Sequence, residues 1–161
     1  MNTVYLQLGS NIGDRKKFLK AAEFSISKDL GVIEKKSKIY ESSPWGVDNQ
    51  SFFLNQALLL NTKLDPFRLL DSILVIERDM GRVRVEKWGE RIIDIDILFF
   101  NDEIIESSDL CIPHRYISKR RFVLEPLFEI AGNLNHPKYN KNISQLLEEC
   151  VDTEKVEIYE A

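Results

Sequence analysis

The segment 91–100, which reads RIIDIDILFF, constrains the fold of this 161-residue chain more than any other feature. In a β-strand, alternate side chains share a face. One face of such a strand would be wholly apolar and would carry Ile93, Ile95, Ile97 and Phe99. The other face would present Asp94 and Asp96 side by side. The sequence therefore predicts a strand that packs one side on the core and holds paired carboxylates on the other.

The order of predicted elements up to this strand is strand, helix, strand, strand, helix, strand. We expect strands at 3–8, 33–42, 52–62 and 91–100 and helices that begin at Asp14 and Asp65 and end at Gly31 and Gly81. This order is the split βαβ pattern of ferredoxin-like folds. We predict an α+β fold with a βαββαβ core and an antiparallel sheet. Helices expected at 124–131 and 143–150 would cover the second face, and residues 1–161 are expected to form a single domain.

Composition and charge exclude several classes of protein. A net charge of −4 argues against a general nucleic-acid binder, and the apolar runs are too short to cross a membrane. The amino terminus lacks a signal pattern, and Cys111 and Cys150 form no disulfide framework. With His114 and His136 as the only histidines, a zinc site would lack ligands. We expect a cytoplasmic monomer without nucleic-acid or membrane partners.

Arginine residues surround the predicted carboxylate pair. Most arginines of the chain lie between Arg78 and Arg121. Two adjacent carboxylates repel each other unless a cation joins them, and magnesium takes one or two carboxylates together with phosphate oxygens. Arginine presents a fork that matches phosphate oxygens. An Asp-x-Asp pair alone would favour an acidic strand edge that merely keeps the protein soluble, but the neighbouring arginines favour magnesium-dependent phosphoryl transfer.

Further residues could recognise phosphate or a flat ring. A second basic cluster contains His114, Arg115 and Arg120. Phe53 and Phe122 are candidates for stacking, although core packing is the commoner role of either alone. Asn55 shares the strand face of Phe53, and its amide could read the edge of a heterocycle. The chain has neither a Walker-type glycine loop nor the protein-kinase signatures, so an ATP site would be of another kind.

Taken together, these motifs resemble the 6-hydroxymethyl-7,8-dihydropterin pyrophosphokinase family over residues 4–130. The matching segments occur in the expected order. They are LGSNIG at 8–13, SPWG at 43–46, FLN at 53–55, Glu77 with GRVR at 81–84, WGERIIDIDIL at 88–98, PHR at 113–115 and RRFVLEPL at 120–127. The block at 88–98, which contains the paired aspartates, is the most specific of them.

The resemblance implies a reaction and a set of site residues. Pyrophosphate would pass from ATP to the hydroxymethyl group of the dihydropterin, releasing AMP, in folate biosynthesis. Asp94 and Asp96 would bind two Mg²⁺ ions, with Arg82 and Arg91 as further catalytic residues. ATP would be bound by Arg82, Arg84, Trp88, Arg91, Ile97, His114, Arg115 and Arg120. The pterin would be bound by Ser43, Pro44, Trp45, Phe53, Asn55, Asp94 and Phe122. Leu74 stands where the family frequently has a glutamine, which leaves one adenine contact open.

Two other classes of function account for part of the pattern. A ferredoxin-like metabolite- or RNA-binding module explains the predicted fold and the basic loop. It does not explain Asp94 and Asp96, which would repel RNA. A magnesium-dependent phosphohydrolase explains the carboxylates but not the paired aromatics with Asn55. ATP turnover with and without a reduced pterin alcohol separates the three: no turnover favours the module, and turnover independent of pterin favours the hydrolase.

Overall fold

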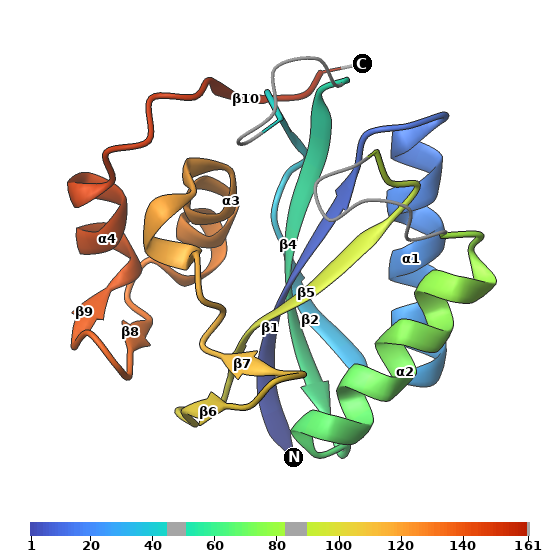
Figure 1. The fold of residues 1–161 in the computed structure, drawn as a ribbon, viewed down its shortest axis with the longest axis horizontal. Helices are drawn as coiled ribbons and strands as arrows, with labels where there is room; N and C mark the ends of the chain where they lie inside the picture. The colour runs from blue at the N-terminus through green and yellow to red at the C-terminus, as the bar shows by residue number, and fades with distance from the viewer. Residues whose placement is uncertain (45–50, 83–89, 161) are drawn as a thin grey trace.

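The centre of the structure, a computed structural model that describes residues 1–44, 51–82 and 90–160, is a six-stranded antiparallel sheet (Figure 1). The strand order is β10-β3-β4-β1-β5, and β2 also pairs with β4. The strands are β1 (Asn2–Ser10), β2 (Val32–Lys36), β3 (Tyr40–Ser42), β4 (Phe53–Thr62), β5 (Asp94–Phe100) and β10 (Val156–Ile158). The long strand β1 lies between β4 and β5.

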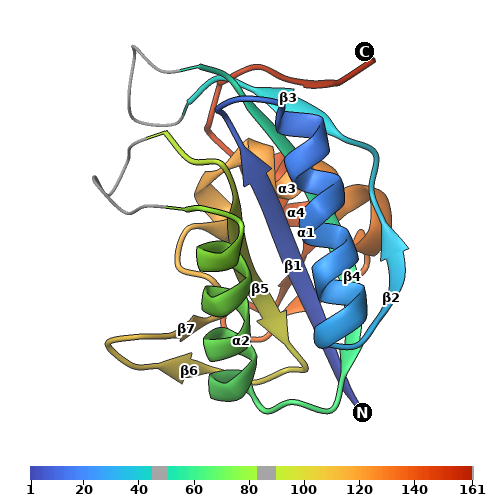
Figure 2. The ribbon, with the colours of Figure 1, turned by 90° about the vertical axis from the view of Figure 1, so that its right-hand side faces the viewer.

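Helices cover both faces of this sheet. Helices α1 (Arg15–Asp29) and α2 (Pro66–Asp79) lie side by side on one face (Figure 2). Helix α3 (Arg121–Ala131) lies against the other face, and α4 (Ile143–Glu149) packs beside it (Figure 1). Smaller elements are the 3-10 helix η1 (Ile117–Lys119), the hairpin of β6 (Ile105–Glu106) with β7 (Cys111–Ile112), and that of β8 (Asn135–His136) with β9 (Lys141–Asn142). The predicted mixture of helices with an antiparallel sheet is confirmed.

The two long helices begin where the sequence predicts. Asp14 accepts a hydrogen bond from the Lys17 N–H, and Asp65 accepts one from the Arg68 N–H. Both are N-caps, which satisfy backbone donors that have no partner inside the helix. After α1, Gly31 passes so close to β4 that a Cβ atom there would lie 2.0 Å from the Asn61 carbonyl oxygen. The chain can turn from helix to strand at this point because residue 31 has no side chain.

The core consists of two apolar clusters, one on each face of the sheet. Ile93, Ile95 and Ile97 belong to the cluster under α1 and α2, as predicted. The prediction that Phe99 shares their face is wrong, because Phe99 packs with Leu98 in the cluster under α3 and α4. The register between β1 and β5 shifts at this point, with Ile97 opposite Leu6 but Phe99 opposite Tyr5. The extra residue reverses the alternation of side chains, as a β-bulge does.

Candidate active site

The two predicted carboxylates lie together on the face of the sheet that α3 covers. Asp94 is paired with Gly9 of β1, and Asp96 is paired with Gln7. Because side chains of a strand pair that stand directly opposite share a face, Gln7 points to the same side as Asp96. Both aspartates are half-buried. The strand thus behaves as its pattern predicts, with isoleucines in the core and carboxylates at a surface.

A first cavity lies over the middle of the sheet. Phe53 of β4 and Phe122 of α3 both line it. Asn55 also lines it and belongs to β4, the strand between β1 and β3. The Asn55 Nδ2 donates to the Ser42 Oγ at 2.8 Å and to the Tyr40 carbonyl at 3.5 Å, and the carbonyl, which can only accept, fixes the orientation of the amide. The full lining comprises Gln7, Gly9, Pro44, Phe53, Asn55, Arg91, Asp94, Asp96, Arg120 and Phe122. Aromatic walls with one oriented amide suit a flat heterocycle.

A second cavity lies beyond the outer edge of β5. Its lining combines apolar residues with a basic cluster. The residues are Leu70, Leu74, Glu77, Asp94, Ile95, Asp96, Ile97, Asp109, Leu110, Cys111, His114, Arg115 and Tyr116. Asp94 and Asp96 line both cavities. Two compounds bound one in each cavity would therefore meet at the carboxylate pair.

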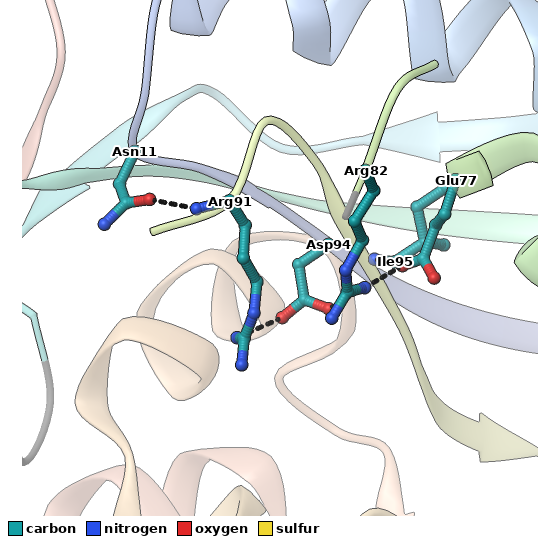
Figure 3. Close-up of polar contacts among 6 residues, drawn as sticks. All are labelled: Asn11, Glu77, Arg82, Arg91, Asp94 and Ile95. Carbon is teal, nitrogen blue, oxygen red and sulfur yellow. Dashed lines mark hydrogen bonds and ion pairs between the residues drawn. The ribbon is translucent and has the colours of Figure 1, made fainter. Parts of the chain in front are cut away.

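A chain of ion pairs surrounds Asp94 (Figure 3). The Arg82 Nη1 lies 2.9 Å from the Asp94 Oδ1 and 2.6 Å from the Glu77 Oε2, and the Arg91 Nη1 lies 3.2 Å from the Asp94 Oδ2. The side chains of Arg82 and Glu77 are only 6% and 5% exposed. Glu77 also accepts the backbone N–H of Ile95 at 2.8 Å. Glu77 therefore joins α2 to both Arg82 and the outer edge of β5.

The position of Arg91 is set by the end of β1. The Asn11 Oδ1 accepts the Arg91 N–H at 2.7 Å (Figure 3). The Asn11 N–H donates to the Arg91 carbonyl at 3.0 Å. The two bonds hold the backbone of Arg91 without using its side chain. The guanidinium group can therefore move between partners while its Cα atom stays in place.

The electrostatics of the pair favour a cation. Burial raises the pKa of Asp96 to about 8, and the Asp94 carboxylate adds to this rise, while Arg120 opposes it. The raised pKa favours the protonated, uncharged form of Asp96 at neutral pH. Within the described part of the chain, no group of three or more His, Cys, Asp or Glu side chains could form a metal cage. Two carboxylates fit magnesium, which completes its shell with water and phosphate oxygens.

His114 is a neutral donor in the second cavity. Burial and the Arg120 guanidinium lower its pKa to about 4. The Nδ1 atom accepts the backbone N–H of Tyr116 at 3.2 Å, so the neutral ring carries its proton on Nε2. Arg120 itself lies over the rings of Tyr116 and Phe122, at 4.6 and 5.6 Å from their centroids. It therefore links the basic cluster to an aromatic wall of the first cavity.

The structure brings together most of the residues predicted from sequence. Phe53, Asn55 and Phe122 line the first cavity, with Pro44, Arg91 and Arg120. Ile97, His114 and Arg115 line the second. The Ser43 hydroxyl donates to the Glu154 carboxylate, and Ser43 lines neither cavity. Trp45, Arg84 and Trp88 lie outside the described residues.

Sequence reasoning assigned no site role to Gln7, Gly9, Asn11 or Glu77. A signal for two of them exists. Gln7 interrupts the mainly apolar run 4–8 of β1, and Glu77 follows the apolar run 73–76 of α2. Both are buried, at 4% and 3% exposure. Buried polar side chains need partners, so their positions in apolar patterns point to a site.

Replacing Glu77 by Gln is expected to lower the free energy of unfolding by about 2 kcal/mol, because Arg82 loses a buried charge partner. Urea unfolding measures this. The matched control is Glu149→Gln, which breaks an ion pair with Lys141 whose side chains are 54% and 46% exposed. The control is expected to change stability by less than about 0.5 kcal/mol. Equal effects of the two substitutions would contradict a structural role for Glu77.

The sequence matches a known protein family. The family model described as 7,8-dihydro-6-hydroxymethylpterin-pyrophosphokinase (HPPK) matches residues 5–132. The chain is 46% identical over 145 residues to the 2-amino-4-hydroxy-6-hydroxymethyldihydropteridine pyrophosphokinase of Aquifex aeolicus, covering 90% of each chain. It is 45% identical over 131 residues to the Bacillus subtilis enzyme of the same name, covering 81% of this chain and 78% of that one.

Solved structures share the fold. A crystal structure of HPPK-DHPS with substrates has a TM-score of 0.75 at 20% identity, covering 91% of this chain and 43% of that chain. A triple mutant of the Plasmodium falciparum HPPK-DHPS has a TM-score of 0.77 at 21% identity, covering 92% and 43%. This chain thus spans less than half of those proteins, and at such identity the likeness concerns the fold alone. On the family match and the two curated relatives, the chain belongs to the 7,8-dihydro-6-hydroxymethylpterin-pyrophosphokinase family.

Proposed function

We propose that the two cavities are the two substrate sites of a pyrophosphoryl transfer, with the pterin in the first and ATP in the second. The chain is an ATP-dependent pyrophosphokinase that transfers pyrophosphate from ATP to the hydroxymethyl group of 6-hydroxymethyl-7,8-dihydropterin, in folate biosynthesis. The observation that carries the assignment of the cavities is that Asp94 and Asp96 line both. The reacting hydroxyl and the β-phosphorus have to come together for the transfer. The two carboxylates, which are common to both cavities, mark the place where they would meet.

The first cavity has the chemistry that a pterin needs. Phe53 and Phe122 would stack on the ring, and the Asn55 amide, oriented by the Tyr40 carbonyl, would bind its polar edge. Pro44 supplies a further wall. A contact between Ser43 and the pterin stays a prediction, because Ser43 lines neither cavity and its hydroxyl donates to Glu154. Contacts from Trp45 stay predictions.

The second cavity has the chemistry that a triphosphate needs. His114 would donate its Nε2 proton to a phosphate oxygen, and Arg115 lies beside it in the lining. Arg82 and Arg91, both paired with Asp94 in the ligand-free protein, would exchange that carboxylate for phosphate oxygens when ATP binds. The apolar residues of the lining, among them Leu74 and Ile97, would hold the base. Roles for Arg84, Trp88 and, at the phosphates, Arg120 stay predictions.

Two magnesium ions are proposed at Asp94 and Asp96. The support is the donor set and its charge, because a carboxylate whose pKa is raised to about 8 is poorly matched to its surroundings without a cation. Bound magnesium would neutralise phosphate charge and lower the pKa of the attacking hydroxyl. Arg82 and Arg91 then become available to balance the charge that remains on the phosphates.

Three broader predictions accompany this function. The core is proposed to be ferredoxin-like, supported by the strand order β5-β1-β4-β2 with antiparallel neighbours. A monomeric state and a cytoplasmic location stay predictions. Among the described residues, no helix has both the length and the apolar character to cross a membrane.

The nucleotide product tests the proposal. Because the pyrophosphoryl group moves as one unit, ATP and the dihydropterin alcohol are expected to give AMP in equal amount to the pyrophosphorylated pterin. Chromatography of the reaction measures this. Stoichiometric ADP would assign ordinary kinase chemistry instead. Turnover of ATP without pterin would indicate a hydrolase.

A further inference from the structure

Gln7 places an unusual polar group inside the first cavity. Its side chain projects from the middle of β1, is 4% exposed and lines the cavity. The neighbouring strand positions on either side, Leu6 and Leu8, belong to the apolar core on the opposite face. A buried carboxamide on a sheet face needs hydrogen-bond partners for both of its ends.

Among the described residues, only one end of the Gln7 carboxamide finds a hydrogen-bond partner. The Nε2 donates to the backbone carbonyl of Phe122 at 3.0 Å. The Oε1 is buried and has no hydrogen-bond partner in the part of the chain that the structure describes. The orientation of the amide is fixed by chemistry, since the reversed orientation would set Oε1 against the Phe122 carbonyl oxygen. An unsatisfied acceptor therefore lies in the wall of the cavity, and burying it there without a donor is costly.

The place of this acceptor indicates which donor it meets. Gln7 stands directly opposite Asp96, whereas Asn55 stands opposite Gly9, one row nearer the end of the sheet. Asn55 is the group suited to reading the ring edge. The substrate hydroxyl must lie at the carboxylates, where the two cavities meet. The hydroxyl is therefore the donor of the pterin nearest to Gln7.

We propose that Gln7 is a positioning residue whose Oε1 accepts a hydrogen bond from the hydroxymethyl group of the bound pterin. This rests on the proposed function of the first cavity and adds a residue to it. The bond from Nε2 to the Phe122 carbonyl holds the amide in place. A hydroxyl that donates to Oε1 keeps its oxygen lone pairs available for the phosphorus atom in the second cavity.

The test compares two ligands that differ only in the hydroxyl group. Dissociation constants of 6-hydroxymethyl-7,8-dihydropterin and of 6-methyl-7,8-dihydropterin are measured by calorimetry, with magnesium and α,β-methylene-ATP present to prevent transfer. Gln7→Met, which keeps the length of the side chain, is expected to raise the dissociation constant of the hydroxymethyl ligand about five- to tenfold. The same substitution is expected to leave the dissociation constant of the 6-methyl ligand within about twofold of the wild-type value.

Gln56→Met provides a matched control. Gln56 is a buried glutamine of the adjacent strand whose Nε2 also donates to a backbone carbonyl, that of Ser37 at 2.9 Å, but it lines neither cavity. Gln56→Met is expected to change the affinity for neither the hydroxymethyl nor the 6-methyl ligand. Equal weakening of both ligands by Gln7→Met would show that Gln7 only supports Phe122, and would overturn the proposal. Unchanged affinities would also overturn it. Pterin-dependent AMP formation by the wild type tests the proposed function separately.

Discussion

Replacing Asp96 by Asn is expected to lower turnover about a thousandfold while raising the thermal stability of the ligand-free protein at pH 8. The loss of turnover follows because one of the two proposed metal ligands becomes neutral. Metal neutralisation of phosphate charge is worth several kcal/mol in the transition state, and each 1.36 kcal/mol is about tenfold in rate. Single-turnover assays at saturating magnesium measure this.

The expected gain in stability follows from the sign of the pKa shift. Burial, together with Asp94, raises the pKa of Asp96 from its usual value of 3.8 to about 8 in the folded protein. Between about pH 4 and pH 8 the folded protein therefore holds a proton that the unfolded chain has released, and stability falls as pH rises. The stability that this group contributes is complete below pH 4 and is lost as pH rises through about 8. An asparagine stays neutral and avoids this loss.

The size of the effect is moderated because Asp96 is half-buried. We expect Asp96→Asn to stabilise the ligand-free protein by roughly 1–2 kcal/mol at pH 8, or about 2–8 °C in melting temperature, and to have little effect at pH 4. Calorimetric scans across this pH range measure it. The control is the exposed Asp102, just beyond β5, whose replacement by Asn should alter neither stability nor turnover. Near-native turnover of Asp96→Asn would refute a metal role for this carboxylate.

The strand pattern around Asp94 and Asp96 was predictable because it depends only on alternation. The caps of α1 and α2 were predictable because Asp14 and Asp65 act locally. The long-range geometry of the sheet was not predictable in this way. The reversal at Phe99 comes from a register shift against β1, and nothing in 91–100 alone signals it.

The remaining differences also arise from packing between distant segments. The predicted strand 33–42 is divided into β2 and β3, because Ser37 turns to bond Ala57 of β4 through both its backbone and its hydroxyl. Phe67 and Leu74 lie at the spacing of an apolar helix stripe in α2, but they are 48% and 42% exposed. Leu74 instead lines the second cavity. A stripe read from sequence cannot separate residues that face the core from residues that face a site.

Replacing Arg91 by Ala is expected to lower the turnover number about a hundredfold and to change stability little. Arg91 lines the first cavity and lies 3.2 Å from Asp94. If it moves to the phosphates when ATP binds, its loss removes charge stabilisation that matters in the transition state, and one such group is typically worth about 10²–10³ in rate. Its backbone stays held by Asn11, and Asp94 keeps its pairing with Arg82.

Two further variants separate the role of the Arg91 guanidinium group from the general effect of removing an arginine. Arg91→Lys keeps the charge but loses the planar fork, so its turnover should lie between those of Arg91→Ala and the wild type. Arg15→Ala is the matched control, because Arg15 pairs with Glu41 at 2.7 Å, is similarly exposed and lines neither cavity. Steady-state kinetics with both substrates varied separates turnover from binding. If Arg91→Ala raises only the KM for pterin and leaves turnover intact, then Arg91 belongs to pterin binding and its proposed transfer to the phosphates is wrong.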